Sequence, residues 1–187
     1  MNEELKLTPL KFDEFNMKQE KMIKYLGMQL HEDGIAASIQ ATVDDRSGKI
    51  RGATFEVKSL IEDFRMAALG GLMGAWVLWE RAMIPSLLSG CCNWVGVSQK
   101  TIDQLDSIQN MYIRVQMRTG QGCSKVMLRA ETSMLGMKQR LWTEKLLFIQ
   151  RLRRMEDSSL AKEVYDEQKL NGWPGLAKKV SEICREI

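Results

Sequence analysis

Apolar residues spaced three and four positions apart leave few choices for the fold of this 187-residue chain. The spacing is most regular after residue 101, where the apolar residues are Ile102, Leu105, Ile108, Tyr112 and Val115. Residues three and four apart lie on one face of an α-helix, so the pattern predicts an amphipathic helix. Thr101 and Gln104 match a capping box, in which two side chains satisfy free N–H groups at a helix start. We therefore expect this helix to begin at Thr101.

The same spacing predicts helices along most of the chain after residue 35. Ile35, Ile39 and Val43 recur every four residues, and we expect the polar run "DDRSG" (residues 44–48) to end that helix. Another helix is expected from residue 54, and Pro85 is expected to start a new segment. Further helices are expected from residue 124, over residues 137–152, near residue 160 and after Pro174. The predicted fold class is therefore mainly α.

Two short segments near the N-terminus carry β patterns instead. Residues 24–31, "KYLGMQLH", predict a β-strand, and "HEDG" at residues 31–34 has the chemistry of a turn. Residues 5–10, "LKLTPL", are expected to pair with this strand. An isolated hairpin is marginally stable in water, so we expect residues 1–34 to be the least stable part unless they pack on the helices. The expected regions are a β-hairpin at 1–34, a helical domain at 35–155 and C-terminal helices at 156–187.

Positive charge is concentrated in one part of the sequence. Residues 107–154 hold ten lysines and arginines but only two acids, Glu131 and Glu144, whereas the whole chain has a net charge of +3. Such a block is typical of a surface that binds a polyanion, although a solvated helix surface is an equally good explanation of the charge. Trp142 lies in this block and is the tryptophan expected to stack on bases. Trp76 and Trp79, three apart on an apolar face, are expected in the core.

The sequence disfavours several other classes of protein. Residues 66–79, the closest candidate for a membrane span, are too short, and the acidic N-terminus does not resemble a signal peptide. We therefore expect an intracellular protein, nuclear or cytoplasmic. Cys91 and Cys92 are adjacent and His31 is the only histidine, which does not match the ligand spacing of zinc sites. We expect no metal, no cofactor and no small-molecule ligand.

The acidic pair Asp44–Asp45 is the arrangement closest to a catalytic motif, since paired carboxylates hold metal ions in polymerases. That chemistry needs a tight β-hairpin and a further acid, whereas this pair ends a helical pattern. We therefore expect a solvated turn, which aspartate favours. A nucleophile would have only His31 as its base, and "GGLMG" matches no phosphate-binding loop. No enzymatic activity is expected.

Five short motifs follow one another over residues 20–170. They are "YLG", a "P-x-L-x-x-G-x-x-x-W" segment, an "L-x-x-I-Q" helix, an "A-E" pair and a basic helix ending in Arg-Leu. After "YLG", their residues are Pro85, Leu87, Gly90, Trp94, Leu105, Ile108, Gln109, Ala130, Glu131, Arg151 and Leu152. In this order they resemble the C-terminal third of the reverse transcriptase of a non-LTR (LINE-like) retrotransposon.

The resemblance implies a primer-grip-like element at Tyr25, Leu26 and Gly27, followed by a helical thumb. The catalytic aspartates of that family lie upstream of this motif, and only 24 residues precede Tyr25. The resemblance therefore implies a truncated, non-catalytic fragment whose partner is an RNA–DNA or DNA duplex, held through its phosphates. The residues expected to touch phosphate are Arg114, Arg118, Lys125, Arg129, Lys138 and Arg151. A polymerase palm or a second copy of the chain is a further expected partner.

Three other interpretations stay open. The helices could form a protein–protein interaction module, with an apolar patch exposed where a palm would lie. Asp44 and Asp45 could bind Mg²⁺ in an enzyme, although two exposed acids make a poor magnesium site without further ligands. The chain could also be a remnant without a selected role.

Overall fold

The computed structural model describes residues 11–12, 15–16, 20–63 and 70–171, and this part of the chain is mainly α, as the periodicity predicts. Its helical elements are α1 (Ile35–Asp63), α2 (Gly70–Leu78), the π-helical η1 (Trp79–Met83), α3 (Ile84–Leu88), the 3₁₀ turn η2 (Cys91–Asn93), α4 (Gln99–Met117), α5 (Lys125–Thr132), α6 (Met137–Arg154) and α7 (Leu160–Asn171). The strands form two antiparallel pairs, β1 (Lys11–Phe12) with β2 (Phe15–Asn16) and β3 (Met22–Tyr25) with β4 (Met28–His31). Residues 5–10 and the helix predicted after Pro174 lie outside the described residues.

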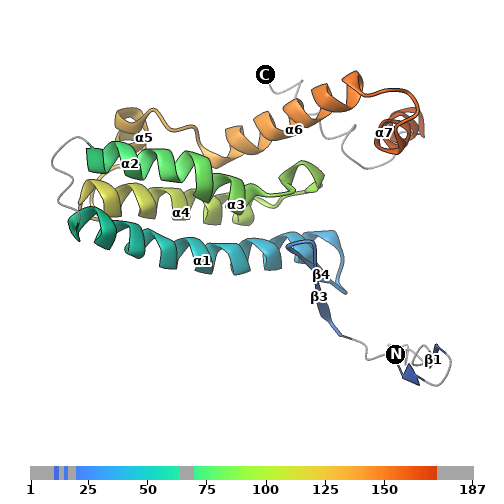
Figure 1. Ribbon diagram of the computed structural model, residues 1–187, viewed down its shortest axis with the longest axis horizontal. Coiled ribbons are helices and arrows are strands. Elements are labelled where there is room, and N and C mark those ends of the chain that lie inside the picture. The colour runs from blue at the N-terminus through green and yellow to red at the C-terminus, as the bar shows by residue number, and fades with distance from the viewer. Residues whose placement is uncertain (1–10, 13–14, 17–19, 64–69, 172–187) are drawn as a thin grey trace.

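The helices form one elongated bundle. Figure 1 shows α1, α4 and the continuous line of α2 and α3 side by side. α5 lies at one end of this bundle, whereas α6 leads away from it toward α7 at the other end. The β3–β4 hairpin lies against α1. None of the described helices is long and apolar enough to cross a membrane.

The segment "KYLGMQLH" is a hairpin and not a single strand. β3 and β4 pair directly, with Tyr25 opposite Met28, so Leu26 and Gly27 form a two-residue turn. Their φ angles of 46° and 79° are both positive, which is the conformation of the type I′ turn that suits the twist of a hairpin. The prediction of one strand was wrong because leucine rarely adopts a positive φ angle, so Leu26-Gly27 does not match the usual sequences of this turn.

A polar stripe on α1 satisfies the outer edge of β4. The Ser38 Oγ accepts from the His31 N–H at 2.8 Å, and the Thr42 Oγ1 accepts from the Gln29 N–H at 2.8 Å. One turn further along, the Arg46 Nη2 donates to the Gly27 carbonyl at 2.9 Å. Two strand residues advance about 6.7 Å and four helix residues about 6 Å, so the two repeats match. The hairpin therefore needs no third strand on this edge.

α1 runs without a break through residues 44–48, contrary to the prediction. Residues on both sides of this run face one core, since Val43 and Ile50 are both buried. Within the run, Arg46 and Ser47 are buried as well. This burial outweighs the local preference of Asp, Ser and Gly for turns, which amounts to only about 1 kcal/mol per residue.

Pro85 does start a new α-helical segment, α3, but the chain does not turn there. α2 continues into α3 through the π-helical segment η1. Proline has no N–H and its ring clashes with the preceding turn, so a wider π turn before it relieves both problems. Trp79 and Met83, at the two ends of η1, are both buried.

α4 begins two residues earlier than predicted, and its cap is Ser98. The Ser98 Oγ accepts from the Thr101 N–H at 3.1 Å. The Thr101 hydroxyl donates instead to the Gln40 Oε1 at 2.8 Å, and the Gln104 Nε2 donates to the Asp44 Oδ1 at 2.7 Å. The predicted capping box was wrong because both side chains join α4 to α1.

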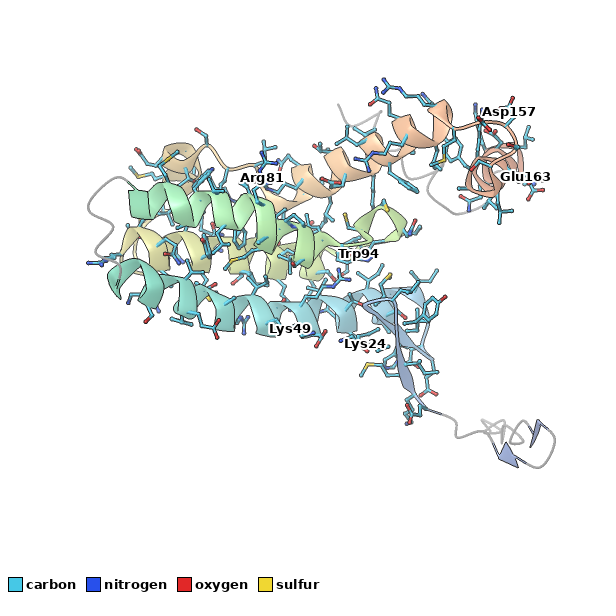
Figure 2. The ribbon with its side chains drawn as sticks, viewed as in Figure 1. Lys24, Lys49, Arg81, Trp94, Asp157 and Glu163 are labelled. Carbon is cyan, nitrogen blue, oxygen red and sulfur yellow. The ribbon has the colours of Figure 1, made fainter. Side chains whose placement is uncertain are left out.

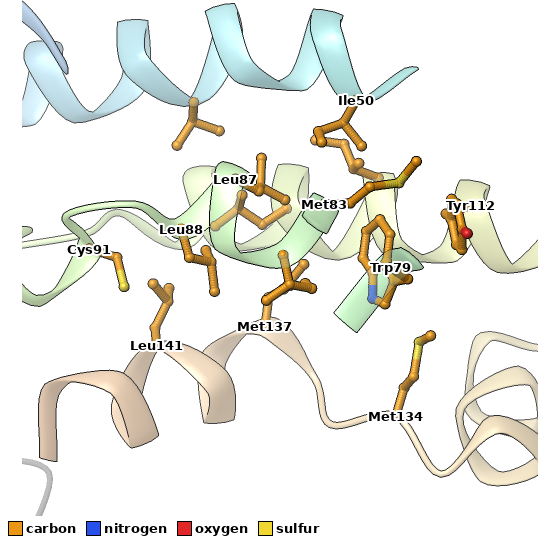
Figure 3. Close-up of a cluster of buried hydrophobic side chains, with 14 of the residues drawn as sticks. Ile50, Trp79, Met83, Leu87, Leu88, Cys91, Tyr112, Met134, Met137 and Leu141 are labelled. Atoms are coloured by element: carbon orange, nitrogen blue, oxygen red, sulfur yellow. The ribbon is translucent and has the colours of Figure 1, made fainter. Parts of the chain in front are cut away.

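The core lies between α1, α3, α4 and the start of α6 (Figure 3). Trp79 is fully buried, as predicted, and its ring stacks on Tyr112 with 4.6 Å between the centroids. The Tyr112 hydroxyl donates to the Ala75 carbonyl at 2.5 Å. Trp76 is only partly buried against the same core. A small second cluster, Ile149, Leu152 and Tyr165, holds α7 against α6.

Candidate nucleic-acid interface

Four cationic side chains from three helices line one groove. Lys58 comes from α1, Arg114 and Arg118 from the C-terminal end of α4, and Lys125 from the start of α5. The groove has a volume of about 850 Å³, and the other residues of the described chain that line it are neutral. We name it the basic groove. It brings together three of the six residues predicted to contact phosphate, and it adds Lys58.

The end of α4 places two of these cations. Arg118 has a φ of 52° and closes α4, with its N–H donating to the Arg114 carbonyl. The chain then turns back, and the Arg114 Nη2 donates to the Cys123 carbonyl at 2.9 Å, which holds the loop before α5. Free carbonyls at a helix C-terminus favour nearby cations. The local fold thus supports a high density of positive charge here.

This groove suits an anion and no particular base sequence. Four cationic side chains around one opening favour the approach of an anion such as phosphate. The lining also contains Ser107, Thr119 and Gln121, which can donate neutral hydrogen bonds. Contacts of this kind fix a nucleic-acid backbone without reading its bases.

The other three predicted phosphate contacts lie elsewhere. Arg129 forms an ion pair with Asp106 at 2.8 Å, and the same carboxylate accepts from the Met137 N–H at 2.9 Å. Arg129 therefore helps to join α4, α5 and α6. Lys138 lies over the Trp142 ring, with its Nζ 4.5 Å from the centroid, so a cation already covers one face of the ring predicted to stack on bases. Arg151 is exposed in the last turn of α6, at the end of the molecule far from α5 (Figure 1).

The primer-grip-like residues meet at the tip of the β3–β4 hairpin. Tyr25 is 62% exposed and Leu26 is 85% exposed, while the Gly27 carbonyl is held by Arg46. Leu26 also has the positive φ that non-glycine residues adopt rarely. An exposed apolar residue in this conformation is a reasonable point of contact with another molecule.

Asp44 and Asp45 lie on α1 and not in the solvated turn that was predicted. Asp44 accepts hydrogen bonds from Gln40 and Gln104. Asp45 accepts from the Lys49 Nζ at 2.6 Å, and this bond holds the pKa of its carboxyl below the usual value. Within the described residues, no three His, Cys, Asp or Glu side chains are grouped so that they could hold a metal ion.

Several of the motif residues on which the resemblance rests are part of the core. Leu87, Trp94, Leu105, Ile108 and Gln109 are all almost completely buried. The Gln109 Nε2 donates to the Leu135 carbonyl at 3.1 Å, which ties α4 to the loop before α6. These motifs therefore account for the fold, whereas the charged groups outside them form the candidate interface.

Sequence reasoning missed Lys58 because it lies about fifty residues before the basic block. Only the packing of α1 against α4 brings it into the groove.

No family model, no curated protein and no solved structure matches this chain in comparisons of its sequence and fold.

Proposed function

We propose that this protein binds the phosphate backbone of a nucleic-acid duplex through the basic groove, as the thumb of a reverse transcriptase would. The observation that carries the proposal is the convergence of Lys58, Arg114, Arg118 and Lys125 on one opening, where no acid is found among the described lining residues. The motif order that resembles non-LTR reverse transcriptases supports it independently. In this proposal the chain is a non-catalytic fragment of an RNA-directed DNA polymerase.

The number of cations sets the expected salt dependence. Each phosphate neutralised by Lys or Arg releases counterions and adds about −0.9 to the log–log slope of affinity against salt. Four contacts therefore predict a slope of about −3.6. Such binding is insensitive to sequence, because no base edge is read.

Fluorescence anisotropy of a labelled 16-base-pair RNA–DNA duplex between 25 and 200 mM salt tests the proposal. The variant Arg118→Gln/Lys125→Gln removes two groove cations and leaves the Arg114 bond to Cys123 intact. It should reduce the slope by about two. The matched control, Arg153→Gln/Arg154→Gln, makes the same charge change on exposed residues of α6. An equal loss in both variants, or a wild-type protein without salt-dependent binding, contradicts the proposal.

A protein–protein interaction module is the second candidate, because the β3–β4 hairpin exposes several apolar side chains. Ile23 is 56% exposed, and it adds to the exposed Tyr25 and Leu26 at the tip. Light scattering coupled to size-exclusion chromatography tests this candidate. A concentration-dependent dimer that Leu26→Asp abolishes would favour it, whereas a monomer at all concentrations would count against association of two copies.

A further inference from the structure

A second cationic pocket lies where the β3–β4 hairpin meets α1 and the end of α3. Its volume is about 320 Å³, and the side chains that matter are Lys24, Asp45, Arg46, Lys49, Ser86 and Ser89. Figure 2 labels Lys24, from β3, and Lys49, from α1, where the hairpin meets the helix, and both lysines pair with Asp45. None of these residues belongs to the basic block of the sequence or to the basic groove. We name it the hairpin pocket.

Arg46 brings a buried positive charge to the hairpin pocket without a carboxylate bonded to it. The residue is only 8% exposed. Its Nη1 donates to the carbonyls of Leu87 at 3.1 Å and Ser89 at 2.7 Å, and its Nη2 donates to that of Gly27 at 2.9 Å. These three bonds use three of the five guanidinium N–H groups, and the two others are one N–H on Nη2 and the N–H on Nε. Carbonyl acceptors satisfy hydrogen bonds but do not cancel the net charge.

Asp45 is the acid that lines this pocket, and two lysines share it. Its Oδ2 lies 2.6 Å from the Lys49 Nζ and 3.8 Å from the Lys24 Nζ. Three cations therefore face one carboxylate, which leaves the pocket with a net charge of +2. Both lysine side chains are more than half exposed, at 62% and 55%. Ion pairs this exposed are weak, so an incoming anion can replace the carboxylate at little cost.

We propose that the hairpin pocket is a second phosphate site for the same nucleic acid, and that Asp45 is a built-in competitor for it. This inference rests on the proposed function. A backbone phosphate takes the place of Asp45 as the acceptor for Lys24 and Lys49. Ser86, Ser89 and Arg46 also line the pocket. Hydroxyl and guanidinium groups are hydrogen-bond donors that suit a phosphate. Asp45 then weakens binding in the wild-type protein by holding the two lysines.

The competitor role makes an unusual prediction, which is that removing one acid tightens binding. Asp45→Asn should raise the affinity for the 16-base-pair RNA–DNA duplex and make the salt slope steeper by about one. With a slope of this size, the gain in affinity of Asp45→Asn over the wild-type protein should be about three- to fourfold larger at 50 mM salt than at 200 mM salt. Lys49→Gln should lower the affinity by a similar factor.

The neighbouring acid supplies a matched control. Asp44→Asn makes the same charge change on the same helix, but Asp44 is bonded to Gln40 and Gln104 and does not line the pocket. Its effect should be less than half that of Asp45→Asn. Equal gains in both variants would mean a general charge effect and would overturn the proposal. Unchanged binding in Asp45→Asn would overturn it as well.

The outcomes separate this inference from the proposed function. If Arg118→Gln/Lys125→Gln weakens duplex binding and Asp45→Asn has no effect, the basic groove stands and the hairpin pocket fails. If the wild-type protein binds no duplex at low salt, both fail. Inorganic phosphate at 10 mM, compared with chloride at equal ionic strength, tests the free ion as the ligand. Thermal stabilisation of Asp45→Asn by phosphate beyond the chloride control, without any displacement of the duplex, would assign the pocket to free phosphate and overturn the backbone assignment.

Discussion

The contact between the β3–β4 hairpin and α1 can be tested with a single hydroxyl group. Thr42 is 1% exposed, and its Oγ1 accepts from the Gln29 N–H while donating to the Ser38 carbonyl at 2.7 Å. Thr42→Val keeps the shape of the side chain but removes the acceptor. The Gln29 N–H then faces a methyl group against the helix and has no partner.

The structure supplies a second threonine that isolates this effect. Thr54 is also buried in α1, and its hydroxyl donates only to the Ile50 carbonyl of its own helix. Thr54→Val therefore loses the same bond within the helix but no bond to another element. Such bonds do not stabilise helices, so this control should change the free energy of unfolding by less than about 0.5 kcal/mol.

The expected difference follows from the unpaired N–H of Gln29. Leaving a buried donor without an acceptor costs about 1–3 kcal/mol, and the extra methyl group of valine offsets at most about 0.8 kcal/mol. Thr42→Val should therefore destabilise the hairpin contact by about 1–2 kcal/mol. This corresponds to a change of about 5–30-fold in the opening equilibrium.

Amide hydrogen exchange measures this opening residue by residue. Protection of the Gln29 amide should fall about 5–30-fold in Thr42→Val and stay unchanged in Thr54→Val. In the wild-type protein, the hairpin amides should exchange faster than those in the middle of α4, as expected for the least stable part of the fold. Equal protection of Gln29 in both variants would refute the hydroxyl contact.

Three further predictions concern the core and the buried ionisable groups. Arg46→Met leaves three carbonyls without their donor and should cost about 2–4 kcal/mol in urea unfolding; a loss under about 1 kcal/mol would contradict the bonding described here. Burial raises the pKa of the Cys91 thiol to about 12, so iodoacetamide at pH 8 should spare Cys91 in the folded protein and modify it in urea, as mass spectrometry would show; rapid labelling of the native protein would disprove it. Burial also raises the pKa of the Tyr112 hydroxyl to about 12, and because the unfolded tyrosine ionises first, stability should fall as pH rises above about 10; unfolding free energies that stay constant up to pH 11 would contradict this.

Periodicity alone was enough to predict the helical class and the central part of the core. Leu105, Ile108 and Tyr112 repeat at helical spacing, and all three are buried. The helix boundaries were less accurate, since the cap of α4 is Ser98, and the Thr101 and Gln104 side chains bond to α1 instead. Polar side chains near a helix start can serve the helix itself or a neighbouring helix, and local sequence does not distinguish these roles.

The candidate sites depended more strongly on tertiary structure. Arg114, Arg118 and Lys125 were expected from the charge of their segment, because residues near in sequence also lie near in space. Lys58 was not expected in the site, because α1 reaches the groove only through its packing on α4. Arg129 had the same sequence signal as Arg118, yet the ion pair with Asp106 gives it a structural contact.

The sequence by itself determined which segments are helical and which face of each is apolar, since both follow from the periodicity of neighbouring residues. Only the tertiary structure decided the conformation of residues 44–48 and the way in which the β3–β4 hairpin is stabilised. Residues 44–48 stayed helical because burial of Arg46 and Ser47 outweighs their preference for a turn. The side chains of Ser38, Thr42 and Arg46 on α1 bond to the backbone of the β3–β4 hairpin and so replace a further strand. This works because a helix turn and two strand residues have nearly the same length. Both outcomes depend on contacts between segments that are far apart in the sequence, and a local sequence pattern does not predict such contacts.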